Sequence, residues 1–171
     1  APDSARGDRT DDTPSPASPI RLGLALSGGG FRAAAFHLGV LKRLEELGVL
    51  PRVEMVSTVS GGSITGALYA LRCAQEGTGA PGSFSVEALV TEMRPVLTQN
   101  LRARAIFGTP WRALLALCSL VSSRISRIGL MVRELDRKLF DGARLNELPS
   151  WIVINATNLR TGKAWKFYPD V

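Results

Sequence analysis

Apolar residues in the first half of the chain follow two patterns, short unbroken runs and repeats at three- and four-residue steps. The run Leu22–Leu26 ends at a glycine turn and Val53–Val59 is rich in β-branched residues, so both predict strands. The repeats predict helices from Phe36 to Leu47 and from Ile64 to Leu71. A strand, a turn and a helix in succession, repeated once, are typical of an α/β fold with a parallel sheet and crossover helices.

The second half of the chain is predicted to be helical first and extended at its end. Residues 84–140 have a helical pattern with expected breaks at Pro95 and at residues 108–110 (Gly-Thr-Pro). Trp151–Thr157 predicts a strand, and a turn separates it from a second extended segment, Ala164–Tyr168. We therefore expect a β-hairpin there.

Composition divides the chain into a leader and one domain. Residues 1–19 hold four prolines, three serines and four aspartates and no large apolar side chain, so they predict a disordered leader. The remaining residues, 20–171, are enough for one domain with a core. Cys73 and Cys118 lie in apolar, helical stretches and are expected to be buried free thiols, with a disulfide as the alternative.

The charge of the chain is strongly positive. A net charge of +6 and a pI near 10.0 favour an anionic partner, which charge alone leaves open between nucleic acid, a membrane surface and a phosphorylated substrate. Between Arg94 and Arg144, ten basic residues stand against three acidic ones, which indicates either core-packing helices with solvated arginines or a lid or membrane-facing surface. The longest uncharged run there, Ala113–Ser123, falls short of the ~18 residues that span a bilayer, so the chain is expected to be soluble or membrane-peripheral.

The first glycine turn follows the first predicted strand. Three consecutive glycines, Gly28, Gly29 and Gly30, leave backbone amides uncovered at the start of a helix, where an oxyanion or a phosphate binds favourably. Arg32 adds a cation in the first helical turn, where the helix dipole disfavours one. Stability gives no reason for this arginine, which favours a functional role.

The second glycine turn, Thr58–Gly62, follows the second predicted strand and holds Ser60. A serine in a sharp strand-to-helix turn presents its hydroxyl at the carboxyl edge of the sheet, and the amide of Gly61 is then available to an oxyanion. We interpret Ser60 as a nucleophile; the alternative is that it caps the helix, a task that Ser57 or Ser63 could also perform. The two turns lie about 30 residues apart on adjacent βα units, where sites of α/β proteins form.

These residues resemble the patatin-like phospholipases, whose Gly-Gly-Gly-x-Arg loop forms the oxyanion hole and whose Gly-x-Ser-x-Gly elbow carries the nucleophile. The match runs from about Leu22 to Tyr69, with a weaker match over residues 134–168. It implies an α/β three-layer sandwich with a mostly parallel sheet, incomplete at the C-terminus, in which residues 20–171 form the N-terminal part of the catalytic domain. The oxyanion-hole residues implied are Gly28, Gly29, Gly30, Arg32 and Gly61, and the elbow residues are Thr58, Val59, Ser60, Gly61 and Gly62.

The family works with a serine–aspartate dyad, so the resemblance implies that His37, the single histidine, is a packed helix residue and not a catalytic one. Thr58 departs from the family by replacing the leading glycine of the elbow, which makes close approach by another strand harder. Asp141–Ala143 spells the family's acidic motif but comes too early in the chain. We therefore expect the catalytic aspartate beyond residue 171 and little or no activity from this chain alone.

The function implied is hydrolysis of a lipid ester, with a phospholipid or related lipid as substrate, peripheral membrane contact, no nucleic acid, and no metal or cofactor. One alternative is a non-catalytic lipid- or partner-binding module on the same fold. Another is a dinucleotide-binding domain, since Gly28, Gly30 and Ala33 fit that fingerprint. That fold requires an acidic residue at the end of the second strand, where this chain has Ser57, Thr58 and Ser60 instead.

Overall fold

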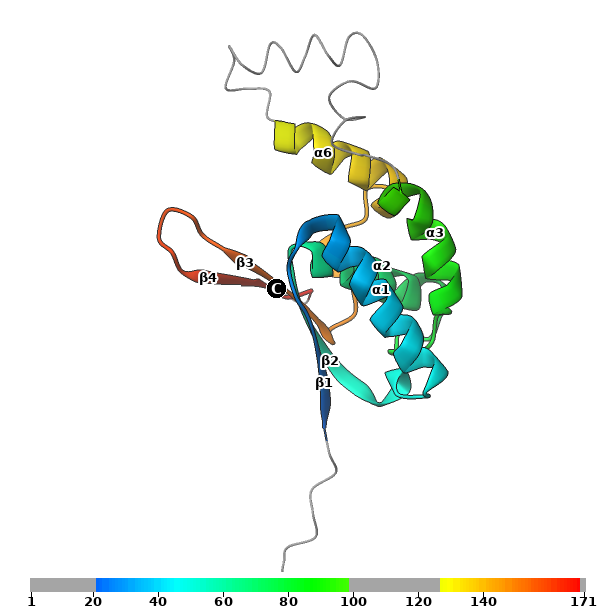
Figure 1. Cartoon of the computed structure of the whole chain (residues 1–171). Coiled ribbons are helices and arrows are strands. Elements are labelled where there is room, and N and C mark those ends of the chain that lie inside the picture. Colours follow the sequence, from blue (N-terminus) through cyan, green and yellow to red (C-terminus); the bar gives the residue numbers. More distant parts are fainter. Residues whose placement is uncertain (1–20, 99–126, 170–171) are drawn as a thin grey trace, which may run out of the picture.

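The computed structural model describes residues 21–98 and 127–169 (Figure 1). The predicted leader, the break at residues 108–110 and Cys118 lie outside these ranges. In chain order the elements are β1 (Leu22–Leu26), α1 (Gly30–Glu46), η1 (Leu50–Arg52), β2 (Val53–Val59), α2 (Gly61–Glu76), α3 (Val86–Thr98), α6 (Arg127–Leu135), η2 (Asp136–Phe140), η3 (Leu145–Glu147), β3 (Ile152–Thr157) and β4 (Ala164–Phe167).

The four described strands form one sheet in the order β1-β2-β3-β4. Strands β1, β2 and β3 run parallel, and β4 pairs with β3 in the antiparallel direction. The predicted α/β class with a mostly parallel sheet is confirmed, as is the hairpin, which extends away from the helices in Figure 1. Parallel pairing brings the carboxyl ends of β1, β2 and β3 to the same edge of the sheet.

Helices α1 and α2 pack on each other, and α2 also packs on one face of the sheet. Their apolar sides form the core together with strand and α3 residues, among them Leu26, Leu41, Val56, Leu68, Tyr69, Leu89, Met93 and Ile152. Residues of β1 and β2 that point to the other face, such as Ala25 and Met55, are exposed. The implied third layer is therefore not found among residues 21–98 and 127–169. Cys73 is a buried free thiol in the core, as predicted.

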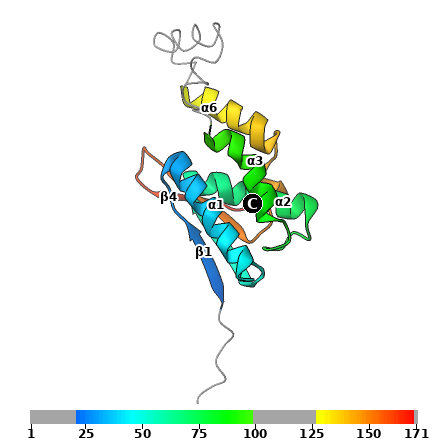
Figure 2. The same ribbon diagram turned by 45° about the vertical axis from the view of Figure 1, so that its right-hand side comes forward.

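Helix α3 packs mainly on α1 (Figure 2) and corrects one prediction. Pro95 was expected to break the helix, but α3 continues through it to Thr98. Proline inside a helix removes one backbone hydrogen bond and costs about 3 kcal/mol. Met93 and Val96, on either side of the proline, are buried in the core, and this burial offsets that penalty.

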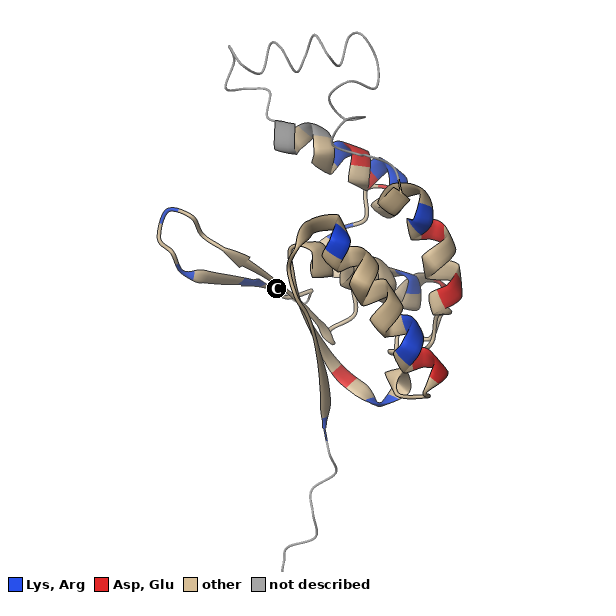
Figure 3. Cartoon of the chain, viewed as in Figure 1, with Lys and Arg blue, Asp and Glu red and all other residues tan. Residues whose placement is uncertain are grey.

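Residues of both charge signs occur along α3 and α6 (Figure 3). In the described part of the predicted basic segment, Arg94, Arg133 and Arg137 are exposed, which agrees with either predicted role of these helices. Glu134 is buried and accepts a hydrogen bond from Arg137 at 3.0 Å. None of the helices in the described ranges is both long and apolar enough to cross a bilayer.

Candidate functional site

The two predicted glycine turns start side by side at the carboxyl edge of the sheet. Leu26, the last residue of β1, lies opposite Thr58 of β2, so the chain leaves both strands at the same level. On the other side of β2, Val59 lies opposite Asn155 of β3. The structure therefore brings the triple-glycine loop, Ser60 and a β3 side chain to one place.

Ser60, in the segment predicted to be the elbow, has an unusual backbone conformation. Its φ is 51° and its ψ is −118° at the junction of β2 and α2, and among the described non-glycine residues only Asp141 shares a positive φ. Such a conformation costs of order 1–3 kcal/mol and is concentrated at functional sites. Ser60 is exposed, and its side chain makes no capping hydrogen bond to α2. Ser60 thus occupies the N-cap position of α2, but its side chain does not cap the helix.

Glycines allow the elbow to contact the first loop directly. A Cβ atom at Gly61 would lie 2.1 Å from the carbonyl oxygen of Gly30, and one at Gly62 would lie 2.4 Å from that of Leu26. The amide of Gly62 donates a hydrogen bond of 3.1 Å to the carbonyl oxygen of Ser27. Any larger residue at these two positions would push the loops apart.

The triple-glycine loop lies beside the serine hydroxyl. A Cβ atom at Gly28 would stand 3.3 Å from Cβ and 3.8 Å from Oγ of Ser60. Gly29 and Gly30 have φ values of 142° and 65°, which favour glycine. Helix α1 begins at Gly30, so the first backbone N–H groups of the helix have no intrahelical acceptor. The exposed hydroxyl of Ser60 thus lies beside the triple-glycine loop, whose peptide groups are not covered by side chains.

Arg32 lies in the first turn of α1 and is exposed. Within the described ranges no carboxylate pairs with it, and the first turn of α1 contains no acidic residue. Arg32 is therefore a solvent-accessible cation two residues after the glycine loop.

Thr58, at the leading position of the elbow, is buried and doubly hydrogen-bonded. Its hydroxyl donates to the carbonyl oxygen of Val153 at 3.1 Å and accepts from Ser63 Oγ at 3.0 Å. Space for its methyl group comes from Gly66, where a Cβ atom would lie 2.6 Å from Thr58 Cγ2. The threonine that departs from the family pattern is thus accommodated by a glycine on α2.

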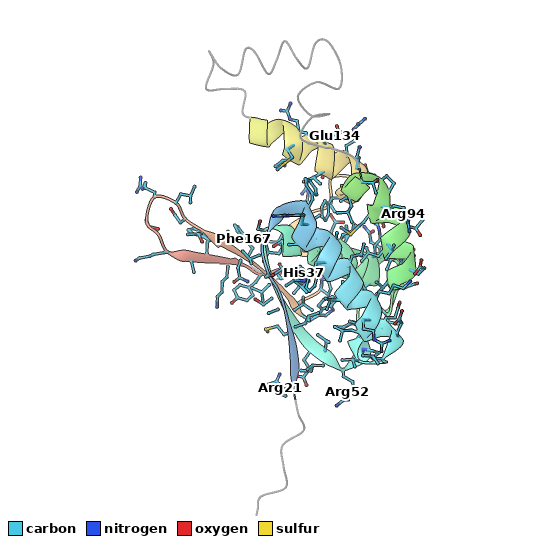
Figure 4. All side chains as sticks on the ribbon, viewed as in Figure 1. Arg21, His37, Arg52, Arg94, Glu134 and Phe167 are labelled. Carbon is cyan, nitrogen blue, oxygen red and sulfur yellow. The ribbon has the colours of Figure 1, made fainter. Side chains whose placement is uncertain are left out.

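Two side chains that support the loops could not be found from sequence. His37 is buried, and its Nε2 atom lies 3.0 Å from the carbonyl oxygen of Ser27 (Figure 4). Asn155 donates from Nδ2 to the carbonyl oxygen of Thr58 at 3.0 Å and to Ser57 Oγ at 2.9 Å. Both contacts join segments that no local pattern connects. The expectation that His37 is a packed helix residue agrees with its burial.

Asp141, the early look-alike of the acidic motif, lies away from Ser60 along α2. It shares a small cavity with Arg72 and Gln75 of α2. With a rise of about 1.5 Å per residue, Arg72 stands roughly 18 Å along the helix from Ser60. Asp141 is exposed and has a φ of 48° in a turn that follows η2. The structure thus places Asp141 beside the C-terminal half of α2.

An apolar cavity of about 770 Å³ begins one helical turn from Ser60. It runs along the side of α2 toward the segment between η2 and β3 and reaches Phe167 of β4. The residues that line it are mostly apolar and include Ser63, Ile64, Ala67, Leu71, Val132, Phe140, Leu145, Leu148, Ile154 and Phe167. An elongated apolar ligand would fit beside the elbow.

Comparison with known proteins matches the region that forms this site. The family model of the patatin-like phospholipases matches residues 24–143. Lysophospholipase NTE1 of Mycosarcoma maydis is 51% identical over 51 residues, covering 30% of this chain and 2% of that protein. Patatin-like phospholipase domain-containing protein 6 of Mus musculus is 36% identical over 86 residues, covering 50% of this chain and 6% of that protein.

A solved structure shares the fold. Human GIVD cytosolic phospholipase A2, in complex with methyl gamma-linolenyl fluorophosphonate, superposes with a TM-score of 0.60 at 18% identity, covering 88% of this chain and 23% of that one. At this identity the likeness concerns the fold alone. The chain spans only 2% to 6% of the length of the curated relatives named above.

Proposed function

Because the chain belongs to the patatin-like phospholipase family, we propose that the complete protein hydrolyses a lipid ester with Ser60 as the nucleophile. The observation that carries this proposal is the strained, exposed Ser60 beside Gly28 at the carboxyl edge of the sheet. A serine held in this conformation is directed at a bound carbonyl carbon. The hydrolase class of the family is consistent with this chemistry.

In the proposed reaction, Ser60 Oγ attacks the ester carbonyl carbon and loses its proton to a general base. The developing oxyanion accepts hydrogen bonds from backbone amides of Gly29, Gly30 and Gly61. The alcohol leaves with the proton, and water then attacks the acyl-enzyme and releases the fatty acid. The base in this proposal is an aspartate that follows residue 171, because Asp141 lies in a separate cavity beside Arg72 and His37 is bound to Ser27.

The surroundings of Ser60 support a lipid substrate. The apolar cavity that begins at Ser63 and Ile64 has room for an acyl chain whose carbonyl carbon reaches Ser60. Exposed Arg32 and the net charge of +6 favour a lipid phosphate and peripheral contact with an anionic membrane. No nucleic acid and no metal or cofactor is part of this proposal.

An alkyl fluorophosphonate probe tests the proposal, since it phosphonylates only an activated serine. We expect the complete protein to be labelled at Ser60, as identified by peptide mass spectrometry, and to release fatty acid from phospholipid vesicles. The Ser60→Ala variant should lose both activities, whereas Ser63→Ala, one turn away, should remain labelled. Labelling that persists in Ser60→Ala would refute the assignment. Vesicle binding without any labelling would support the non-catalytic module.

A further inference from the structure

The carbonyl oxygen of Ser27 joins the two loops of the proposed site. It accepts a hydrogen bond from the amide of Gly62 at 3.1 Å, and the Nε2 atom of His37 lies 3.0 Å from it. A carbonyl oxygen can only accept, so Nε2 carries the proton in this contact. The same ring nitrogen lies 3.2 Å from Ser27 Oγ. Ser27, which precedes the glycine loop, is thus hydrogen-bonded both to α2, through Gly62, and to α1, through His37.

The glycine loop itself has no side chains that could hold it in place. Gly28, Gly29 and Gly30 follow Ser27 directly, and Gly29 and Gly30 have positive φ values. Glycine loses more conformational freedom on folding than any other residue, so a loop of three needs external anchors to present its amides in one arrangement. The carbonyl group of Ser27 is the last backbone group before this loop.

His37 is suited to serve as such an anchor. It lies two turns into α1, is only 4% exposed, and contacts the ring of Phe36 edge-on at 5.4 Å. Its burial therefore leaves the imidazole little room to change orientation. A buried, fixed donor holds its acceptor better than a mobile surface group, because little rotational freedom remains to be lost.

We infer that His37 is a positioning residue for the oxyanion loop, acting through the Ser27 carbonyl group on the amides of Gly29 and Gly30. The inference rests on the proposed function, because it concerns where these amides stand relative to Ser60 Oγ. His37 takes no proton from Ser60 in this role, since its Nε2–H group is bound to Ser27. Its contribution is made to the transition state, where the oxyanion forms.

Phosphonylation kinetics of the complete protein test this inference with three variants. His37→Met keeps the volume of the side chain and removes the donor, whereas His37→Gln keeps an N–H group near the position of Nε2. Thr65→Val is the matched control. It removes another buried hydrogen bond between α2 and α1, from Thr65 Oγ1 to the carbonyl oxygen of Ala34 at 2.9 Å, which does not involve Ser27.

We expect His37→Met to lower the limiting rate of phosphonylation about 10- to 100-fold at saturating probe, with the half-saturating concentration little changed. His37→Gln should recover most of this rate, and Thr65→Val should keep the wild-type rate despite a lower Tm. Where His37→Met gives no folded protein, His37→Asn replaces it, because its side chain is too short to reach Ser27.

Other outcomes overturn the inference in distinguishable ways. Equal rates in wild type and His37→Met would show that the loop needs no such anchor. A rate loss in Thr65→Val equal to that in the His37 variant, in proportion to Tm, would show a general effect of stability. A wild-type protein that is not labelled at Ser60 would refute the proposed function, and the role of His37 with it.

Discussion

The contact between Thr58 and Gly66 makes the sharpest prediction about how the elbow is supported. Gly66→Ala would place a Cβ atom 2.6 Å from Thr58 Cγ2 and 3.0 Å from Leu26 Cδ1. Neither neighbour has room to move, because both are about 1% exposed and the Thr58 hydroxyl binds Val153 and Ser63. Overpacking in such a core costs about 1–3 kcal/mol.

Two further contributions decide the net effect. Replacing glycine by alanine inside a helix favours the folded state by about 1 kcal/mol. If Thr58 turns to relieve the clash, its hydrogen bond to the Val153 carbonyl oxygen is lost, at a net cost of about 1 kcal/mol. We therefore expect Gly66→Ala to lower the free energy of unfolding by about 2 kcal/mol, which corresponds to a Tm lower by about 4–8 °C.

Urea unfolding followed by tryptophan fluorescence measures this effect. Thr58→Ser is the partner variant, because it removes Cγ2 and keeps the hydroxyl. On its own it should cost about 1 kcal/mol, but in the double variant the alanine methyl fills the space, so Gly66→Ala should become close to neutral. Gly39→Ala in α1 is the control, since a Cβ atom there meets nothing within 4 Å and should be stabilising. A Gly66→Ala protein as stable as Gly39→Ala would refute the reasoning, as would a Thr58→Ser background that restores nothing.

Three other predictions follow from single contacts or groups. Gly61→Ala should abolish phosphonylation in the complete protein, because its Cβ atom would stand 2.1 Å from the Gly30 carbonyl oxygen and force the loops apart; a fully labelled variant would contradict this. Asn155→Leu leaves the carbonyl oxygen of Thr58 without its side-chain donor, so the free energy of unfolding should fall by about 1–3 kcal/mol in urea titrations. Burial raises the pKa of the Cys73 thiol above its ordinary value of 9.0. The unfolded chain therefore loses this proton first as the pH rises above about 9, and stability should decrease there. In Cys73→Ala that decrease should be shallower, as pH-dependent Tm measurements would show.

The sequence by itself determined the local elements around the site. The bounds of β2 agree with the predicted Val53–Val59, and β1 with Leu22–Leu26, because short apolar runs that end at glycine turns have few alternatives. The apolar repeats that predicted α1 and α2 each lie within a single segment, so these helices could be predicted without knowing any contact between distant residues. Ser60 could be singled out for the same reason, since its neighbours leave space for a sharp turn. Pro95 shows the limit, because a local rule predicted a break that burial of α3 overrode.

Only the tertiary structure decided how these elements support the serine. The register of β1 on β2, the φ of 51° at Ser60 and the contact of His37 with Ser27 depend on which segments meet in space. Thr58 and Gly66 illustrate the reason. Thr58 is a branched residue where the family has glycine, and Gly66 is a glycine inside a helix, so each looks unfavourable alone. They fit because the two positions face each other. Such complementarity comes from packing between segments, which a one-dimensional pattern of residues does not contain.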